Sequence, residues 1–343
     1  MKRWPEGLRW LWPLSLAYSA AARIRAGSYR RGIFRVRRLP GKVISVGNLT
    51  VGGTGKTPVV LWIAEQLAAE GKRPAILMRG YRGTHSPDSR GEPQSDEVAL
   101  LRNRLNGKVQ MGVGANRYEK GLALARHGVE WFVLDDGFQH LELARDVDIV
   151  LLDATDPFGG GRTLPAGRLR EPISALQRAN VVLITRSVQS PAPAIEAMVR
   201  RFTKCPILYT TTRLEGVLRL PQLVVELPPT DWARARFFAF CGIGNPTAFF
   251  DDLRRWGFQV VGERSFADHH VYSAQEAVTL ERLARSCGAD ALLCTEKDVW
   301  NLRHVQFAGL PAYCCRIALD LPAEAFRNCI LEAIGHGRHG TAA

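Results

Sequence analysis

The sequence predicts an α/β protein with a doubly wound, mostly parallel sheet and a second, smaller α/β domain. Short apolar runs rich in β-branched residues alternate with segments of helical periodicity along its 343 residues. Near 211–229 the pattern breaks into short segments with prolines, and the alternation then resumes on a smaller scale. Strands that alternate with helices are typical of a parallel sheet, which binds ligands at the carboxyl ends of its strands.

A glycine-rich loop lies between the first predicted strand, 43–46, and an apolar helix that opens with Pro58. Backbone N–H groups of such a loop can surround phosphate oxygens, and the helix N-terminus adds a favourable dipole. The strict pattern G-x-x-x-x-G-K-[ST] would place glycine at position 50, so this loop belongs to a more tightly spaced variant. We expect a P-loop NTPase-like fold that binds ATP and Mg²⁺. The expected nucleotide-binding residues are Thr50, Val51, Gly52, Gly53, Thr54, Gly55, Lys56 and Thr57.

The remaining elements follow from apolar periodicity. The segment 59–70 is an amphipathic helix that Gly71 ends, and the polar segment 84–94 predicts a surface loop. Further strands of the first half are expected at 74–78, 109–113, 131–134, 147–152 and 181–184, with helices that begin near Ser95 and Asn116. The second half is expected to contain strands at 237–241, 258–261 and 291–294 and helices at 247–256 and 273–286.

The first 42 residues differ from the rest of the chain in charge. The net charge is +13, no acidic residue lies between Gly7 and Ala64, and eight basic residues lie from Arg23 to Lys42. The uncharged stretch 10–22 is too short to span a bilayer, which takes about 20 residues. We interpret residues 1–42 as a basic amphipathic segment that binds an anionic membrane surface. A nucleotide-binding domain at 43–215 and a smaller α/β domain at 216–343 would follow.

Other interpretations of this segment stay open. The stretch 10–22 could be the core of a signal peptide with a cleavage site in Ser19–Ala22, although a dense basic run follows it directly. A solvated basic arm is also compatible with the composition. Nucleic acid is not expected as a partner, because basic and aromatic residues are not interleaved beyond the N-terminus. The seven cysteines, all at or beyond position 205 and without metal-ligand spacing, favour a reducing compartment.

Two adjacent carboxylates, Asp135 and Asp136, follow the predicted strand 131–134. Carboxylates at a strand end downstream of a phosphate loop are the expected Mg²⁺ partners. One of them, together with Thr57 and phosphate oxygens, is enough for this ion. The other would organise water or orient the nucleophile. Alternatively, the pair simply begins a turn.

Asp96, His269 and His270 are weaker candidates from the residues alone. Asp96 lies in the first turn of a predicted helix, where the dipole by itself favours an acid. The two histidines precede Ser273, the expected cap of another helix. A catalytic pair would need an aspartate that accepts a hydrogen bond from a histidine.

Several motifs occur together in one order along the chain. They are VGNLTVGGTGKTP, Arg79-Gly80-Tyr81, Ser95-Asp96-Glu97, VLDDGFQH, LPAGRLREP, FADHH and Thr295-Glu296-Lys297-Asp298. Together they resemble the tetraacyldisaccharide 4'-kinases of lipid A biosynthesis in Gram-negative bacteria. The resemblance implies ATP-dependent phosphorylation of the 4'-hydroxyl of a tetraacyldisaccharide 1-phosphate, which forms lipid IVA. It also implies a peripheral enzyme at the cytoplasmic face of the inner membrane.

The resemblance also assigns roles to residues. It implies that Asp96 is the general base with His269, more than His270, as its partner from the other domain. The site would then be complete only when the domains close. It further implies that Lys56 and Asp136 are catalytic. Thr57, Asp135 and Asp136 would bind Mg²⁺, and His140, Arg170 and Glu171 would lie near the substrate, a lipid A disaccharide precursor.

A membrane-associated P-loop ATPase of the partitioning or targeting type is the alternative function. It shares the loop and the basic N-terminus. It predicts ATP hydrolysis that a protein partner stimulates, with no lipid acceptor.

Overall fold

The computed structural model describes residues 10–80, 95–187, 192–225 and 234–336. The chain forms two compact units. The first unit comprises 1–81, 105–211 and 319–343, and the second comprises 82–104 and 212–318. Strand β7 (Ile207–Arg219) runs from the first unit into the second.

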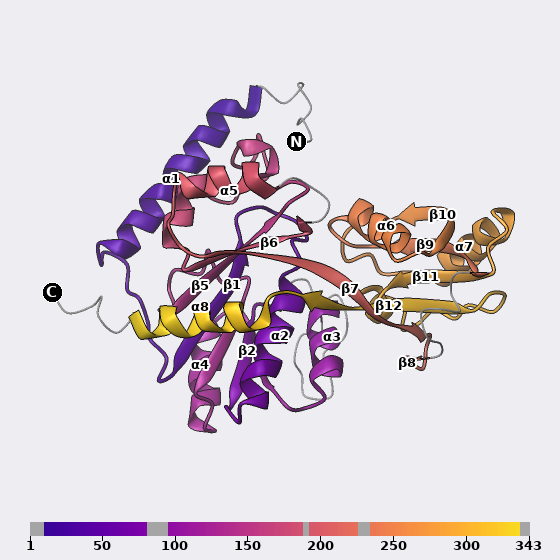
Figure 1. Ribbon diagram of the computed structural model, residues 1–343, viewed down its shortest axis with the longest axis horizontal. Coiled ribbons are helices and arrows are strands. Elements are labelled where there is room, and N and C mark those ends of the chain that lie inside the picture. The colour runs from indigo at the N-terminus through magenta and orange to yellow at the C-terminus, as the bar shows by residue number, and fades with distance from the viewer. Residues whose placement is uncertain (1–9, 81–94, 188–191, 226–233, 337–343) are drawn as a thin grey trace. The chain divides into compact units, whose positions relative to one another are not determined.

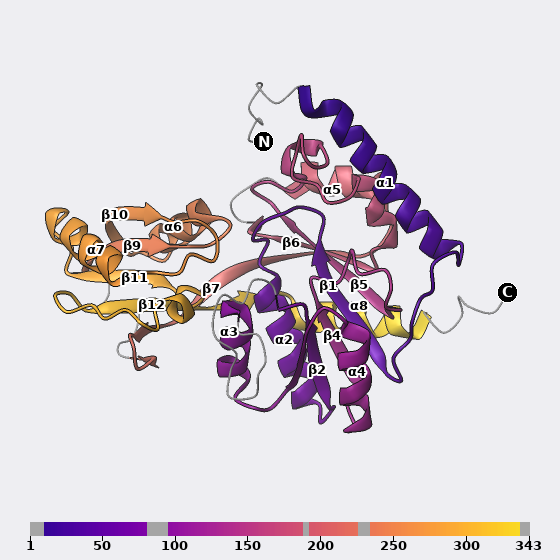
Figure 2. The same cartoon turned by 180° about the vertical axis from the view of Figure 1, so that it is seen from behind.

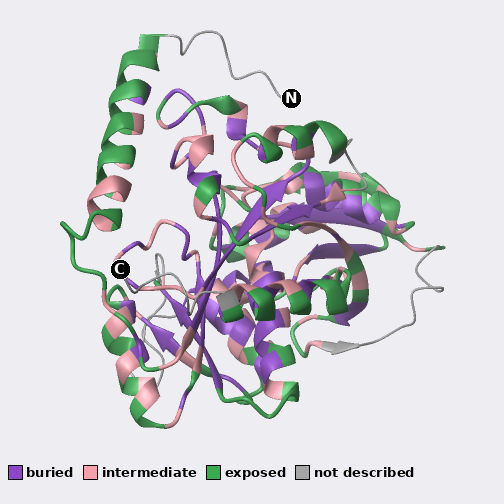
Figure 3. Cartoon of the chain, turned by 60° about the vertical axis from the view of Figure 1, so that its left-hand side comes forward, coloured by how far each residue is buried: buried purple, intermediate pink, exposed green. Residues whose placement is uncertain are grey.

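The first unit is built on a parallel sheet with the strand order β3-β2-β4-β1-β5-β6-β7 (Figure 1). Its central strands are buried along almost their whole length, which Figure 3 shows in purple. Such continuous apolar runs are typical of strands with both faces covered. The strand bounds are β1 Lys42–Asn48, β2 Pro74–Met78, β3 Gln110–Val113, β4 Trp131–Asp135, β5 Val147–Asp153 and β6 Val181–Thr185.

Helices cover both faces of this sheet, as the two opposite views show (Figures 1 and 2). On one face, α4 (Arg117–Arg126) and α5 (Ala192–Arg200) pack against apolar residues of β1, β2 and β4 and of β5 and β6, respectively. On the other, α2 (Lys56–Ala69) and α8 (Ala323–His336) contact the central strands. The rings of Trp62 in α2 and Phe326 in α8 lie 5.3 Å apart. The predicted doubly wound fold is therefore confirmed.

The second unit has its own sheet, with the strand order β10-β9-β11-β12-β7. One apolar core lies under α6 (Pro246–Arg255) and another includes residues of α7 (Ala274–Ser286). Ser273 caps α7 in a reciprocal capping box with Glu276. Helix α3 (Asp96–Leu105) also belongs to this unit, except for its last residue. The strand bounds are β8 Val224–Val225, β9 Arg236–Cys241, β10 Gln259–Ser265, β11 Ala291–Thr295 and β12 Ala312–Asp320.

The compact units differ from the expected division into 1–42, 43–215 and 216–343: residues 1–42 belong to the first unit, a boundary lies at 211/212, and two helices change sides. Helix α3 belongs to the second unit although it precedes most of the first in sequence. Helix α8 returns to the first unit, where Phe326 is fully buried and Arg327 Nε lies 2.8 Å from Glu70 Oε1. These contacts join residues that are far apart in sequence, and the periodicity of a single segment cannot predict such contacts.

The N-terminal helix α1 (Trp12–Arg30) is mostly exposed, and Ser15 is its only buried residue. The Ser15 hydroxyl donates a 2.7 Å hydrogen bond to the backbone oxygen of Thr163 in the first unit. Within the described ranges no helix is both long and apolar enough to cross a membrane. The predicted surface loop 84–94 lies outside the described residues.

Candidate active site

The loop between β1 and α2 has the backbone of a phosphate loop. Gly52 and Gly55 have φ angles of 116° and 80°, a region that favours glycine. Gly55 is the N-cap of α2, so Lys56 and Thr57 occupy the first helical turn, where backbone N–H groups lack partners within the helix. The side chain of Asn48, at the end of β1, donates a 2.8 Å hydrogen bond to Thr50 O and fixes the start of the loop.

Arg168, which sequence reasoning did not single out, fixes the middle of this loop. Its Nη2 donates to the Val51 carbonyl at 2.8 Å, and Val51 N–H donates back to Arg168 O at the same distance. Its Nη1 lies 3.0 Å from Asp156 Oδ2. A Cβ atom at Gly52 would lie only 2.5 Å from Arg168 Nη2, so a side chain at this position would displace the guanidinium group. The signal in the sequence was the motif LPAGRLREP, which contains Arg168.

Lys56, Asp136 and Arg170 form a charged cluster beside the loop. Lys56 Nζ lies 3.4 Å from Asp136 Oδ1 and donates to Asn48 Oδ1 at 3.3 Å. Arg170 Nη1 lies 3.0 and 2.8 Å from the two carboxylate oxygens of Asp136. Burial alone would raise the pKa of Asp136, but Lys56 and Arg170 lower it to about 2. Asp136 is therefore an ionised partner of two cations at neutral pH.

Arg117 is a further cation at this cluster that the sequence did not reveal. This buried arginine begins α4, and its Nη1 donates to the backbone oxygen of Asp136 at 3.2 Å. Desolvation lowers the pKa of Arg117, and the nearby Asp135 and Asp136 oppose this effect. With Arg170, it places two guanidinium groups beside Asp136.

The oxygen donors next to the loop fit Mg²⁺. Asp135 ends β4 as the register partner of Val46, and its side chain is buried. Its carboxylate and the hydroxyl of Thr57 are the hard ligands that Mg²⁺ prefers. In the part of the chain that the structure describes, no cluster of His, Cys, Asp or Glu could hold a metal ion alone. Asp136, already paired with two cations, fits the role of a Mg²⁺ ligand less well than Asp135.

His140 and Glu171 have different surroundings. Burial and the positive charge of Arg117 lower the pKa of His140 to about 4, so its ring is neutral at pH 7. Glu171 is buried and makes two hydrogen bonds, of 2.9 and 3.0 Å, with Arg178. The Arg178 guanidinium also lies 4.3 Å from the ring centroid of Phe138. Glu171 therefore orients Arg178, which in turn packs on Phe138 of the DDGFQH segment.

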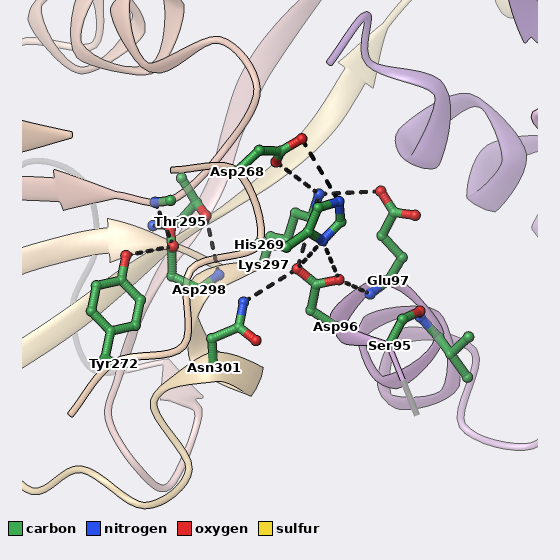
Figure 4. Close-up of polar contacts among 12 residues, drawn as sticks. Ser95, Asp96, Glu97, Asp268, His269, Tyr272, Thr295, Lys297, Asp298 and Asn301 are labelled. Carbon is green, nitrogen blue, oxygen red and sulfur yellow. Dashed lines mark hydrogen bonds and ion pairs between the residues drawn. The ribbon is translucent and has the colours of Figure 1, made fainter. Parts of the chain in front are cut away.

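The second unit brings Asp96 and His269 into contact (Figure 4). His269 Nδ1 lies 2.9 and 3.0 Å from the two carboxylate oxygens of Asp96. The Asp96 side chain is 2% exposed, and that of His269 is 31% exposed. His270 instead lies 2.9 Å from Glu276 and stacks on Phe266. The structure therefore places His269, and not His270, against Asp96.

The pKa values of the pair shift in opposite directions. Burial would raise the pKa of Asp96, but the hydrogen bond from His269 and the charge of Lys297 lower it below its usual value. The hydrogen bond to Asp96 raises the pKa of His269 against burial and Lys297. A proton is therefore held on the histidine, with Nδ1–H donating to an ionised carboxylate.

The expectation that Asp96 and His269 come from different domains is not met, because both belong to the second unit. Helix α3 carries Asp96 into that unit. The pair is therefore assembled within one compact unit and requires no domain closure to form.

Comparisons with known proteins identify the family of this chain. A family model described as tetraacyldisaccharide-1-P 4'-kinase matches residues 8–335. The tetraacyldisaccharide 4'-kinase of Geobacter sulfurreducens is 41% identical over 308 residues, which cover 86% of this chain and 84% of that protein. The enzyme of Desulfotalea psychrophila is 39% identical over 342 residues, which cover 93% and 95%. The crystal structure of "apo" form LpxK from Aquifex aeolicus in complex with ATP superimposes with a TM-score of 0.72 at 29% identity, covering 94% of this chain and 98% of that one. On these matches, and with its phosphate loop and Asp–His pair, the chain belongs to the tetraacyldisaccharide 4'-kinase family.

Proposed function

We propose that this kinase transfers the γ-phosphoryl group of ATP to the 4'-hydroxyl of a tetraacyldisaccharide 1-phosphate, the precursor that becomes lipid IVA. Family membership carries the proposal, and the cations at the phosphate loop support it. Phosphoryl transfer depends mainly on positioning and on neutralising the charge of the phosphate oxygens. The alternative of a partitioning or targeting ATPase is not favoured, because the chain matches the kinase family over most of its length.

The phosphates of ATP are assigned to the loop 50–57 and the N-terminus of α2. ATP is the ligand of the Aquifex aeolicus structure. Lys56 and Arg170 each pair with the ionised Asp136, and a triphosphate competes with that carboxylate for the same cations. Asp136 therefore keeps both cations oriented until the nucleotide binds. Thr57 and Asp135 would hold Mg²⁺, which supplies further charge neutralisation when bound.

The Asp96–His269 pair is assigned to the proton of the acceptor hydroxyl. Both oxygens of Asp96 already accept hydrogen bonds, from His269 and from the backbone N–H of Glu97 at 2.9 Å. The proton taken from the hydroxyl is therefore shared across the pair, which acts as one base. A base is most effective when its pKa lies near the working pH. The contact lowers the pKa of Asp96 and raises that of His269, so the two groups titrate as one coupled pair.

A transfer assay tests the proposal directly. Purified protein is incubated with γ-labelled ATP, Mg²⁺ and tetraacyldisaccharide 1-phosphate in detergent micelles, and the lipid is then extracted and separated by thin-layer chromatography. We expect the label in the lipid, and its loss when the acceptor lacks a free 4'-hydroxyl. Label released only as inorganic phosphate would support the ATPase alternative.

Helix α1 is assigned to the cytoplasmic surface of the inner membrane. Its exposed apolar side chains can enter the headgroup region, and neighbouring arginines can contact anionic lipid. The helix is held by Ser15 to Thr163, and Arg25 Nη1 donates to Gln139 O at 3.2 Å. The exposed apolar residues at and within α1 include Trp10, Trp12, Leu14, Leu16, Tyr18 and Ile24.

Replacing Trp10, Leu11 and Trp12 together by Ser is expected to release the protein from anionic vesicles. Full burial of one large apolar side chain contributes about 1.5–3 kcal/mol, so vesicle affinity should fall at least about tenfold. Activity on the lipid acceptor should fall with it, whereas ATP affinity should not change. Vesicle co-sedimentation at low and high salt measures the effect, and salt should weaken wild-type binding without abolishing it.

A matched control for this variant replaces Val261 and Val278, which are exposed on the second unit, by Ser. This control should bind vesicles as the wild type does. N-terminal sequencing that finds cleavage near Ala22, or binding to DNA in preference to vesicles, would contradict the membrane assignment.

A further inference from the structure

The motif Thr295-Glu296-Lys297-Asp298 begins at the last residue of β11, and of its four residues only Lys297 has been described so far, through its charge beside Asp96 and His269. Asp298 is completely buried, and one of its oxygens accepts hydrogen bonds from the Tyr272 hydroxyl at 2.8 Å and from Gly242 N–H at 2.7 Å. Its other oxygen accepts from the Thr295 hydroxyl at 2.5 Å. Asp298 therefore fastens the end of β11 to the loop after β9 and to the segment before α7.

Gly242 links Asp298 to His269 by hydrogen bonds of its backbone. The Gly242 carbonyl accepts a 3.0 Å hydrogen bond from the backbone N–H of His269. The φ angle of His269 is 62°, a conformation that is uncommon for residues other than glycine. A buried carboxylate thus fixes, through one glycine, the backbone from which the histidine ring projects.

Lys297 lies among three carboxylates around the pair (Figure 4). Its Nζ lies 3.2 Å from Glu97 Oε1, 3.6 Å from Asp268 Oδ1 and 4.0 Å from Asp96 Oδ2. Burial alone would lower the pKa of Lys297, but these carboxylates raise it above its usual value, so the side chain stays charged. Asn301 Nδ2 donates to Asp96 Oδ2 at 3.3 Å and completes the surroundings of that carboxylate.

Glu296 holds the opposite end of helix α3. Its Oε2 lies 3.4 Å from Nη1 of Arg104, which is in the last turn of α3, and its Oε1 lies 3.1 Å from Arg316 Nε. Arg104 Nη1 also lies 2.8 Å from Glu215 Oε2. Two consecutive residues of the motif therefore hold the two ends of α3, because Lys297 lies at its first turn and Glu296 at its last.

We propose that the motif 295–298 fixes α3 to the second unit and that Lys297 is a positioning residue for the Asp96–His269 pair. The inference rests on the role proposed above for that pair. Lys297 acts through the carboxylate: its charge keeps Asp96 ionised and oriented, so that Asp96 continues to accept from His269 Nδ1. Among the described residues, the charged groups beside the pair and Lys297 are Glu97 and Asp268, which oppose this effect.

Lys297→Met is expected to lower kcat at pH 7 by up to about a hundredfold, the loss that a small displacement of a reacting group can cause. KM for the acceptor should change little, because Lys297 acts on the pair. Loss of the cation should raise the pKa values of both Asp96 and His269, since its charge lowers both. The acid limb of the kcat profile should therefore move to higher pH, and part of the lost activity should return as the pH rises. Lys297→Arg should restore most of the activity.

Arg254→Met is the matched control, because it also removes a cation with two carboxylate partners in the second unit, Asp251 and Glu263. It should leave the pH profile unchanged. NMR titration of the His269 ring is a readout that needs no activity, and it should show a higher pKa in Lys297→Met than in the wild type. If Lys297→Met does not fold, Lys297→Gln removes the charge with less change in polarity.

The inference would be overturned if Lys297→Met shifted neither the acid limb of the kcat profile nor the pKa of His269. It would also be overturned if KM for the acceptor rose while the acid limb stayed at the wild-type pH. A wild-type enzyme that labels no lipid would instead overturn the proposed function, while the His269 titration would still test the position of Lys297.

Discussion

Lys56→Ala should reduce kcat for phosphoryl transfer by about a hundredfold to a thousandfold, the scale of loss when one preorganised charge-stabilising group is removed. Lys56 lies in the first turn of α2, where its Nζ pairs with Asp136 and Asn48. Its contact with phosphate oxygens should strengthen as charge moves during transfer, and only interactions that strengthen in the transition state raise kcat. Single-turnover transfer to the lipid acceptor measures the effect.

The fold should survive this substitution. Asp136 keeps its two contacts with Arg170 when Lys56 is truncated, so this carboxylate is not left without a cation. Lys42→Ala is a matched control, since Lys42 begins the same strand, β1, and its Nζ lies 3.2 Å from Asp146 Oδ1. The control should retain activity, and both variants should melt near the wild-type temperature. Turnover within about tenfold of wild type in Lys56→Ala would contradict the assignment of the loop.

The elements that the sequence predicted are those with a local signal. β1, its glycine-rich loop and α2 follow one another within 43–70, and period and turn residues identify all three. The same holds for β4 and the two aspartates at its end. The family motifs then identified Asp96 and His269, which neither spacing nor composition singles out.

Among the arginines that complete the site, Arg117 and Arg178 carried no such signal, and Arg168 lies in a family motif that did not by itself reveal its role. Arg117, Arg168 and Arg178 each act on a loop or carboxylate that another segment supplies, and a surface arginine has the same appearance in the sequence. The membership of α3 in the second unit was missed for a related reason. The ion pair that holds it joins Arg104 to Glu296, which are 192 positions apart. Contacts of this kind depend on the tertiary fold, and periodicity reports only which face of an element is apolar.

The Asp96–His269 contact has a consequence for kinetics because each residue sets the other's protonation. The carboxylate raises the pKa of His269, and the ring lowers the pKa of Asp96. Activity should therefore fall as the pH decreases through the apparent pKa of the pair, which then gains a proton and can accept no other. Without His269 the only remaining base of the pair is the Asp96 carboxylate, whose pKa is lower than that of a histidine. The acid limb of the pH–activity profile should therefore move to lower pH.

Asp96→Asn and His269→Ala should each reduce kcat by roughly 10²–10⁴, the contribution typical of a general base. The double variant should be little slower than the worse single variant, because removing either residue already removes the unit that takes the proton. Asn at position 96 still accepts a hydrogen bond from the ring, so His269 keeps its place, whereas the negative charge that supports its protonation is gone. The measurement is a double-mutant cycle. It compares the rates of lipid phosphorylation of the wild type, the two single variants and the double variant across pH at saturating ATP. Losses that multiply would mean that the two side chains contribute independently, and the 2.9 Å contact between them would then be structural.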